Sequence, residues 1–404
     1  MSIPIRAAVA WEAGAKLSIE EFDLDEPRRD EILVRVEATG VCHTDESSRL
    51  GRLPVVYPII LGHEGSGTVE AAGQDVTRVR PGDKVLFTPD YCGTCEQCVL
   101  GYTPYCEQQT SVTFTGTRQD GSPRAHQNGK PVRASFFGQS SFATHSLVTE
   151  RNIIPVPADA PLHYLAGLTC GVQTGAGVML NAIGVAPHQT VAVFGTGAVG
   201  LAAVMAARAS GAREIVAVDR VRHRLDLALE LGATNVGDTT GRDLADVTAQ
   251  VVRVTGKGAD AILDTTGNPE VIMAAVNSAA VHGTISVITS SGKEVTLPPG
   301  ALLLTGRKLR GTMGGHFNPT SAHHGINNSQ DPHPHAGDML NLVVGKDGKA
   351  KATLVAKGPT LGEGPNSLFH EGGTALVIHA KADDLMSDPS GNSGDRIACG
   401  VIEK

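Results

Sequence analysis

Two hydrophobic patterns follow one another along the chain. Up to about Pro157, short apolar runs such as residues 7–10, 31–36 and 84–87 are separated by Gly, Pro and Asp residues. This pattern predicts short β-strands joined by turns. Further on, Ala/Leu/Gly stretches of helical length alternate with Val/Ile runs such as residues 191–194. Strands that alternate with helices indicate βαβ units and a parallel sheet.

A third pattern begins near Gly315, where Gly, Asn, Asp, Pro and His residues crowd together. The full length of 404 residues also exceeds what one hydrophobic core usually serves. We therefore expect an α/β protein in three parts. These parts are a β-rich domain over residues 1–157, a doubly wound parallel sheet over residues 158–314, and a distinct C-terminal segment over residues 315–404.

Charge and hydropathy exclude several classes of partner. A net charge of −8, without clusters of Lys and Arg, argues against binding to nucleic acid or to an anionic membrane. The first residues lack the basic and apolar regions of an export signal, and no apolar run is long enough to span a membrane. We therefore expect a cytoplasmic protein that acts on a small molecule. In that reducing compartment, its seven cysteines favour metal binding or catalysis over disulfides.

A glycine motif follows the apolar run at residues 191–194 and precedes a helical stretch. Its glycines are Gly195, Gly197 and Gly200. They permit a tight turn, so that a pyrophosphate can lie at the N-terminus of the next helix. The following strand ends at Asp219, at about the offset of an acid that binds the ribose 2′-hydroxyl, which favours NAD.

Two alternatives to NAD binding stay open at this motif. Three arginines, Arg220, Arg222 and Arg224, lie close to the acid and would accommodate the 2′-phosphate of NADP if they turn inward. A Gly-rich packing turn beside a capping Asp would bind no cofactor at all.

Four cysteines fall within one short loop. They are Cys92, Cys95, Cys98 and Cys106, in the spacing C-x2-C-x2-C-x7-C. Four thiolates suit a closed tetrahedral structural zinc, which would fold the loop and leave no coordination position for chemistry. An iron–sulfur cluster is the main alternative, and a pair of disulfides is a weaker one.

A catalytic metal needs three protein ligands and one open position. Cys42, His63 and Cys170 are the candidate ligands, and a zinc ion there would lower the pKa of a bound alcohol before hydride passes to nicotinamide. Thr44 is placed to accept the alcohol proton. Asp45 or Glu64 would orient one of these ligands by a hydrogen bond, without binding the metal itself. Taken singly, each of these residues is more often structural.

Residues 1–314 resemble the zinc-containing medium-chain alcohol dehydrogenases. The motifs Gly-His63-Glu-Gly-x-Gly, the four-cysteine loop, Cys170-Gly-x-x-Thr-Gly and the glycine turn occur in the order of that family. The phrases Cys42-His-Thr-Asp and Cys170-Gly-Val-Gln-Thr-Gly-Ala-Gly look most like its aryl (benzyl) alcohol dehydrogenase branch. The resemblance implies a GroES-like catalytic domain, a Rossmann domain, and a homodimer or homotetramer.

The same resemblance assigns roles to single residues. It implies that Cys42, His63 and Cys170 bind catalytic zinc, that Thr44 starts the proton relay, and that His43 lies near the cofactor pyrophosphate. Ser47 stands where many members carry a relay histidine, so the resemblance does not assign the route by which the proton reaches solvent.

Residues 315–404 resemble instead the C-terminal half of the copper-zinc superoxide dismutases, which implies a partial Greek-key β-barrel. By that likeness His316, His324, His335 and Asp338 bind zinc, with His316 bridging to copper, and His379 binds copper. Asp383 would link the two metal sites, and Arg396 would guide superoxide. The family's His-x-His copper ligands and the cysteine that pairs with Cys399 have no counterpart upstream.

The sequence therefore predicts a chimeric chain with one main activity. We expect zinc-dependent oxidation of a primary, aryl alcohol to its aldehyde, with NAD as hydride acceptor. Two alternatives remain: a superoxide dismutase-type metal-binding activity of the C-terminal segment, with zinc and copper, and an inactive chimeric protein that binds zinc without turnover.

Overall fold

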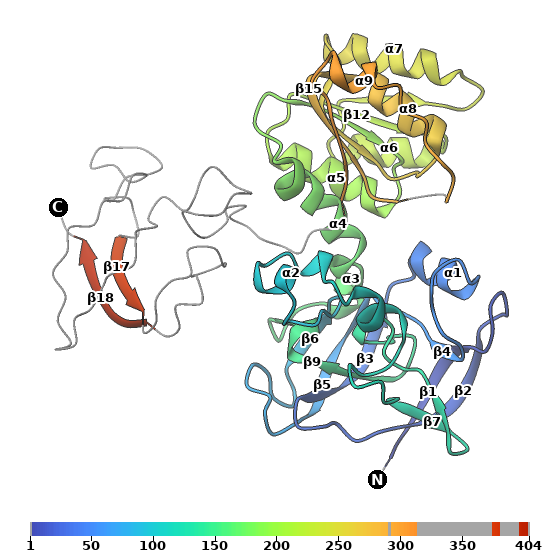
Figure 1. Ribbon diagram of the computed structural model, residues 1–404, viewed down its shortest axis with the longest axis vertical. Helices are drawn as coiled ribbons and strands as arrows, with labels where there is room; N and C mark the ends of the chain where they lie inside the picture. Colours follow the sequence, from blue (N-terminus) through green and yellow to red (C-terminus); the bar gives the residue numbers. More distant parts are fainter. Residues whose placement is uncertain (1, 290–291, 313–373, 380–395, 403–404) are drawn as a thin grey trace. The chain divides into compact units, whose positions relative to one another are not determined.

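The computed structural model describes residues 2–289, 292–312, 374–379 and 396–402. The N-terminal part is built from two five-stranded antiparallel sheets, drawn from blue to green in Figure 1. The first sheet, in the order β4-β1-β2-β7-β8, comprises β1 (Ile3–Ala10), β2 (Ser18–Leu24), β4 (Ile59–Ile60), β7 (Ala125–Gln127) and β8 (Lys130–Val132). The second, in the order β10-β6-β5-β3-β9, comprises β3 (Glu31–Thr39), β5 (Gly65–Ala72), β6 (Lys84–Phe87), β9 (His145–Thr149) and β10 (Ile153–Val156).

Strand β3 connects the two cores of this part. Successive side chains of a strand point to opposite faces of its sheet. Leu33 accordingly packs in the core that contains Ile5 of β1, while Ile32 and Val34 pack with Phe87 in the other. Because both faces are buried, residues 32–34 of β3 form a continuous apolar run instead of an alternating one.

Short helices interrupt the strands of this part. They are α1 (His43–Arg49), α2 (Glu96–Val99), η1 (Thr103–Tyr105), η2 (Thr110–Phe114), η3 (Phe136–Gly138) and η4 (Glu150–Asn152). A second run leads toward the parallel sheet and comprises α3 (Leu162–Leu165), η5 (Ala166–Thr169), α4 (Gly171–Gly177) and η6 (Val178–Ile183).

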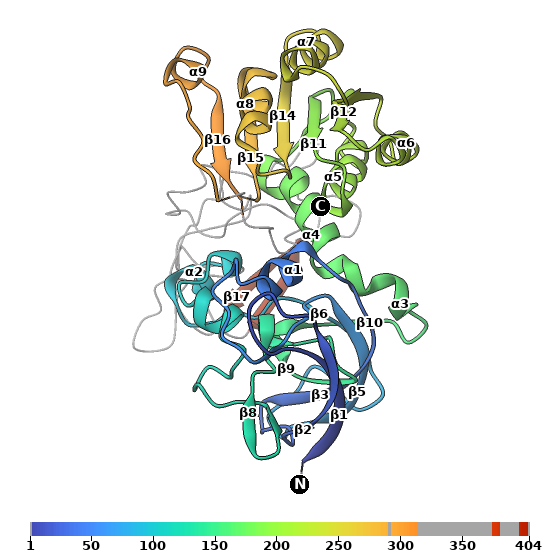
Figure 2. The same cartoon turned by 90° about the vertical axis from the view of Figure 1, so that its right-hand side faces the viewer.

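The next part is a six-stranded parallel sheet in the order β13-β12-β11-β14-β15-β16, and Figure 2 shows most of these strands side by side. Its strands are β11 (Thr190–Phe194), β12 (Glu214–Asp219), β13 (Asn235–Asp238), β14 (Ala259–Asp264), β15 (Ala279–Val287) and β16 (Lys308–Gly311). Its helices are α5 (Ala198–Ala209), α6 (Arg222–Glu230), α7 (Leu244–Thr255), α8 (Pro269–Asn277) and α9 (Gly300–Leu303).

Helices cover both faces of this sheet. Val191 and Val193 of β11 pack with residues of η6, α5 and α6 on one face. Ala192 and Phe194 of the same strand pack with residues of α7 and α8 on the other. This is the doubly wound arrangement, and its topological switch point lies between β11 and β14, where ligands of such sheets bind.

Two further strands are described near the C-terminus. They are β17 (Thr374–His379) and β18 (Arg396–Ile402), which pair antiparallel with His379 opposite Arg396. Among the described residues, no helix is long and apolar enough to cross a membrane.

Candidate catalytic centre

Three side chains from distant parts of the chain meet at one point. The Sγ of Cys170 lies 3.9 Å from the Sγ of Cys42 and 3.3 Å from the Nε2 of His63. A tetrahedral zinc would place two sulfur ligands about 3.8 Å apart, and a sulfur and a nitrogen about 3.6 Å apart, from the usual bond lengths. The spacing and chemistry of this donor set therefore fit a zinc ion.

Glu64 belongs to the same cluster. Its carboxylate and the ligand atoms of the three residues above all lie within 4.8 Å of one another. Burial raises the pKa of Glu64, and the nearby charge of Cys42 adds to this effect. Gly40 makes room for the carboxylate, because a Cβ at Gly40 would lie 1.8 Å from its Oε2. Of the two residues expected to orient a ligand, Asp45 or Glu64, Glu64 instead has its carboxylate among the ligand atoms themselves.

Asp45 contacts two of these candidate ligands, Cys42 and His63. It lies in the first turn of α1, where its Oδ2 accepts a hydrogen bond from the backbone N–H of Cys42 at 3.0 Å. Its Oδ1 accepts from the N–H of Gly62 at 3.0 Å and lies 2.9 Å from the Nδ1 of His63. The Nε2 of His63 is thereby directed at the two sulfurs, which is the orienting contact that metal-binding histidines usually have.

The close contacts within the cluster shift the pKa values of its members. A hydrogen bond from the Cys170 thiol lowers the pKa of Cys42 to about 3, while the same contact raises the pKa of Cys170. Burial disfavours the charged form of His63, but the hydrogen bonds to Asp45 and Cys42 outweigh it and raise its pKa to about 10. The two thiols thus ionise in separate steps, and metal binding would release the remaining protons.

Other expected residues lie close by along the chain. His43 and Thr44 open α1, directly after Cys42; His43 is exposed and Thr44 is half-buried. Ser47 is half-buried in the same helix. Cys170 occupies the junction between η5 and α4.

An aromatic cluster borders the imidazole of His63. The Phe137 ring stacks on it at a centroid distance of 4.6 Å and an interplanar angle of 26°, and the Phe136 ring meets it edge-on at 5.8 Å. Phe114 packs against both phenylalanines. The sequence interpretation missed this cluster. Only the adjacent pair Phe136-Phe137 hints at it, since the third ring, Phe114, comes from the separate helix η2.

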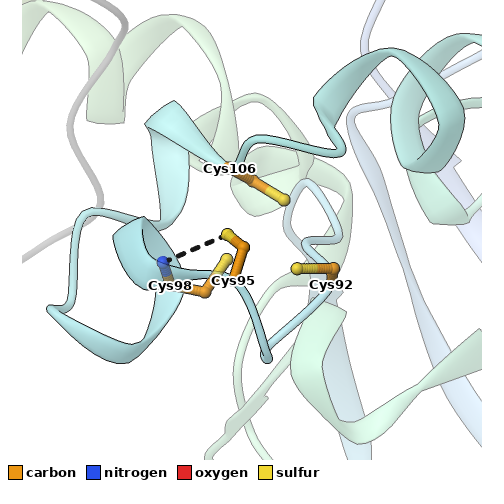
Figure 3. A group of neighbouring side chains, drawn as sticks. All are labelled: Cys92, Cys95, Cys98 and Cys106. Atoms are coloured by element: carbon orange, nitrogen blue, oxygen red, sulfur yellow. Dashed lines mark hydrogen bonds between the residues drawn. The ribbon is translucent and has the colours of Figure 1, made fainter.

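The four-cysteine loop brings its sulfurs together (Figure 3). The Sγ atoms of Cys92, Cys95, Cys98 and Cys106 lie within 4.8 Å of one another. Cys95 caps α2 by accepting a hydrogen bond from the N–H of Cys98 at 3.5 Å. Three of the four cysteines are buried. A set of four sulfurs fits a closed metal site with no position for substrate.

The glycine turn connects β11 with α5. Gly195 has a φ of +88°, which favours glycine. A Cβ at Gly200 would lie 1.9 Å from the carbonyl oxygen of Gly195, so the helix can approach the turn only without a side chain there. A Cβ at Gly197 would meet nothing within 4 Å, so its backbone is open to a ligand. This geometry suits the approach of a pyrophosphate to the start of α5.

Asp219 closes the end of β12 beside that turn. Its Oδ2 accepts hydrogen bonds from the N–H and hydroxyl of Thr196 at 2.7 and 2.9 Å. Its Oδ1 accepts from the N–H groups of Arg220 and Val221. Burial alone would raise the pKa of Asp219, but these hydrogen bonds outweigh it and keep the pKa below its usual value. The guanidinium of Arg222 pairs with Asp226 at 2.7 Å.

The expected metal ligands of the C-terminal segment fall mostly outside the described residues. His316, His324, His335 and Asp338 lie there, as does Asp383. His379 ends β17, and its register partner is Arg396 at the start of β18.

Family models match three stretches of the chain. The alcohol dehydrogenase GroES-like domain matches residues 28–158, and the zinc-binding dehydrogenase model matches residues 198–325. The copper/zinc superoxide dismutase model matches residues 281–402. The last two overlap over residues 281–325. Within that overlap, the described strands β15 and β16 belong to the parallel sheet.

Individual relatives agree with the first two models. Geraniol dehydrogenase of Castellaniella defragrans is 41% identical over 308 residues, 76% of this chain and 82% of the relative. The structure of benzyl alcohol dehydrogenase from Acinetobacter calcoaceticus is 38% identical, covers 78% of this chain and 86% of its own, and has a TM-score of 0.74. The structure of a putative zinc-binding dehydrogenase from Sinorhizobium meliloti, bound to NADP, is 26% identical. It covers 77% of this chain and 84% of its own, and has a TM-score of 0.63.

These matches confirm both resemblances predicted from the sequence, as well as the GroES-like and Rossmann architecture. They also indicate a zinc-dependent enzyme that uses a nicotinamide cofactor and acts on a small-molecule alcohol. The chain belongs to the zinc-containing medium-chain alcohol dehydrogenases, and its C-terminal segment matches the copper/zinc superoxide dismutase family.

Proposed function

We propose that the chain oxidises a primary, aryl alcohol to its aldehyde with NAD as the hydride acceptor. The observation that carries the proposal is the convergence of Cys42, His63 and Cys170 on one point. Two sulfurs and one nitrogen leave a tetrahedral metal with an open position. A zinc ion held there would supply a Lewis acid that lowers the pKa of the alcohol hydroxyl.

The residues around this point have separate tasks in the proposed reaction. Asp45 holds the His63 imidazole in the orientation that directs Nε2 at the metal position. Thr44, at the start of α1, is the first hydroxyl of the relay that carries the proton of the alcohol away. The carboxylate of Glu64 lies within the cluster and would be a further ligand for a metal held there.

The aromatic cluster supports an unsaturated substrate. The Phe137 ring stacks on the His63 imidazole, and the Phe114 ring packs edge-on against Phe137. Flat rings pack favourably with other flat groups, by stacking or edge to face. The relatives also fit this class: one is named a benzyl alcohol dehydrogenase and another a geraniol dehydrogenase.

The proposed cofactor site supports NAD over NADP. Asp219 is ionised at neutral pH, because its pKa lies below its usual value, and a carboxylate at this place repels a 2′-phosphate. Arg222 is engaged with Asp226. We propose that Gly195, Gly197 and Gly200 admit the pyrophosphate and that His43 lies near it. A homodimer or homotetramer is part of the same proposal.

The test is cofactor reduction by the purified chain with benzyl, geranyl, allyl and short alkyl alcohols, using NAD and NADP in parallel. We expect kcat/KM to be at least tenfold higher for benzyl alcohol than for ethanol, and higher with NAD than with NADP. Equal values for benzyl alcohol and ethanol would contradict the aryl assignment, and faster turnover with NADP would contradict the cofactor assignment.

The match to superoxide dismutases favours a second candidate function for the C-terminal segment. In this proposal His316, His324, His335 and Asp338 bind zinc, and His379 binds copper together with ligands that the sequence does not supply. Copper content and superoxide consumption, measured on one sample, distinguish this reaction from alcohol oxidation. A chain that binds zinc and shows neither reaction would be the inactive chimera.

A further inference from the structure

The side chain of Gln139 is fully buried, and both the nitrogen and the oxygen of its amide are hydrogen-bonded. Its Nε2 donates to the carbonyl oxygen of His63 at 2.9 Å, and its Oε1 accepts from the N–H of Gly65 at 3.1 Å. One amide therefore holds the two peptide groups on either side of Glu64, the first of which directly follows the Cα of His63. The side chains of His63 and Glu64 both reach the metal cluster described above.

The backbone of Gln139 is itself fixed from several directions. Its N–H donates to the carbonyl oxygen of Phe136 at 3.0 Å, and its own carbonyl accepts from the hydroxyl of Ser146. One residue earlier, the carbonyl oxygen of Gly138 accepts from the Nη1 of Arg124 at 2.9 Å. The backbone that carries the Gln139 side chain is thus held in place by hydrogen bonds of its own.

A second contact from the same turn reaches the His63 ring itself. Phe137 adopts a left-handed backbone conformation with a φ of +52°, which is unusual for a bulky residue. In this conformation its ring stacks on the imidazole. The turn therefore contacts His63 twice, by Phe137 at the ring and by Gln139 at the backbone.

We propose that Gln139 is a positioning residue for the metal ligand His63. By holding His63 O and Gly65 N, it fixes the direction from which the His63 imidazole and the Glu64 carboxylate reach the cluster. Small displacements matter here, because a metal site tolerates only a few tenths of an ångström in ligand position. The inference rests on the metal site proposed above, since without that site Gln139 would have no ligand to position.

The test compares metal release from the full chain and from two variants, Gln139→Leu and Gln139→Glu. Leucine removes both hydrogen bonds at similar volume. Glutamate keeps the acceptor for Gly65 but turns a carboxylate oxygen toward the His63 carbonyl, unless it is protonated. The matched control is Gln127→Leu, because in the described part of the chain the Gln127 side chain bonds to Glu20 and Glu21 of β2 and not to the metal cluster.

The measurement uses protein with Co²⁺ in place of zinc and follows the thiolate–cobalt absorption after a chelator is added. We expect Gln139→Leu to lose one metal per chain at least tenfold faster than the unaltered protein, while the four-cysteine site keeps its metal. We expect Gln139→Glu also to release this metal faster than the unaltered protein, because an ionised carboxylate does not donate a hydrogen bond to His63 O. Gln127→Leu should behave as the unaltered protein.

Two results would overturn the proposal. One is release at the unaltered rate from folded Gln139 variants. The other is loss of both metals together with the fold in both variants, since Gln139 would then be a packing residue only. Failure of the proposed metal site is recognised separately, because the unaltered protein itself would then hold no metal at Cys42, His63 and Cys170.

Discussion

At the scale of single residues, a sequence pattern finds groups that carry chemistry more readily than groups that support them. Cys42, His63 and Cys170 stand in motifs with a known chemical logic, and they do meet. Gln139 and Arg124 stand in no motif, and their importance comes only from burial and from their partners. A buried polar side chain is informative only once its partners are known.

Asp219 provides a residue-scale test of the cofactor proposal. We predict that Asp219→Ser lowers kcat/KM for NAD by about 10- to 100-fold, the range expected for a lost hydrogen bond to a charged group. The same change should narrow the preference for NAD over NADP, because the repulsive carboxylate is gone. Steady-state kinetics with both cofactors measure the two effects.

The control for this prediction is Glu230→Ser. Glu230 is exposed at the C-terminal end of α6, the end opposite Arg222, so its removal leaves the ion pair between Arg222 and Asp226 intact. It should leave the NAD/NADP ratio close to the unaltered value. An unchanged ratio in Asp219→Ser would show that this carboxylate does not select the cofactor.

At the scale of elements, the apolar runs predicted the strands well. The runs at residues 31–36, 84–87 and 191–194 all lie in strands. The short helices η2 and η3 were not expected, because they hold only a few residues and depend on tertiary contacts. The start of β15 at Ala279 was also missed. A bulge with His282 at a φ of +61° interrupts its pattern before the apolar run from residue 284.

A buried ion-pair network links the start of β3 to the turn that carries Phe137. The carboxylate of Glu31 accepts from Arg118 at 2.8 and 3.0 Å and from Arg124 at 3.0 Å. The Nη1 of Arg124 also donates a hydrogen bond to the Oγ of Ser135 at 2.7 Å, and Ser135 directly precedes that turn. All four side chains are buried. Removing one charge from such a network typically costs about 3–5 kcal/mol, because the remaining charges stay buried.

This network predicts a pH dependence of stability. Burial alone would raise the pKa of Glu31, but Arg118 and Arg124 hold it below its unfolded value of 4.5. The stabilisation by Glu31 is therefore complete above pH 4.5 and is lost as the pH falls through the lower folded pKa. We predict that Glu31→Gln lowers the free energy of unfolding by about 3–5 kcal/mol at pH 7, and by less at acidic pH.

Urea denaturation at several pH values measures this effect. The control is Glu70→Gln, because Glu70 makes an exposed ion pair with Arg35, and such pairs contribute at most about 1 kcal/mol. The same loss of stability for Glu31→Gln at pH 7 and at pH 3 would contradict the account.

At the scale of the whole molecule, motif order predicted the family better than any single motif. The boundary of the C-terminal segment is harder to predict. Two family models overlap over residues 281–325, while β15 and β16 pair in the parallel sheet. Sequence likeness alone does not decide which fold a shared stretch adopts, whereas strand pairing does. The proposed tail ligands His316, His324, His335 and Asp338 lie outside the described residues and remain a prediction.

The central claim is that one zinc ion, held by Cys42, His63 and Cys170, enables alcohol oxidation. The most direct measurement is alcohol-dependent NADH formation by the full chain before and after a chelator has removed the more labile zinc, with metal content determined on the same samples. The account predicts that turnover disappears with this zinc and returns when zinc is added back, but that Cys170→Ser does not recover. Undiminished turnover in the metal-depleted protein, or in Cys170→Ser, would contradict it.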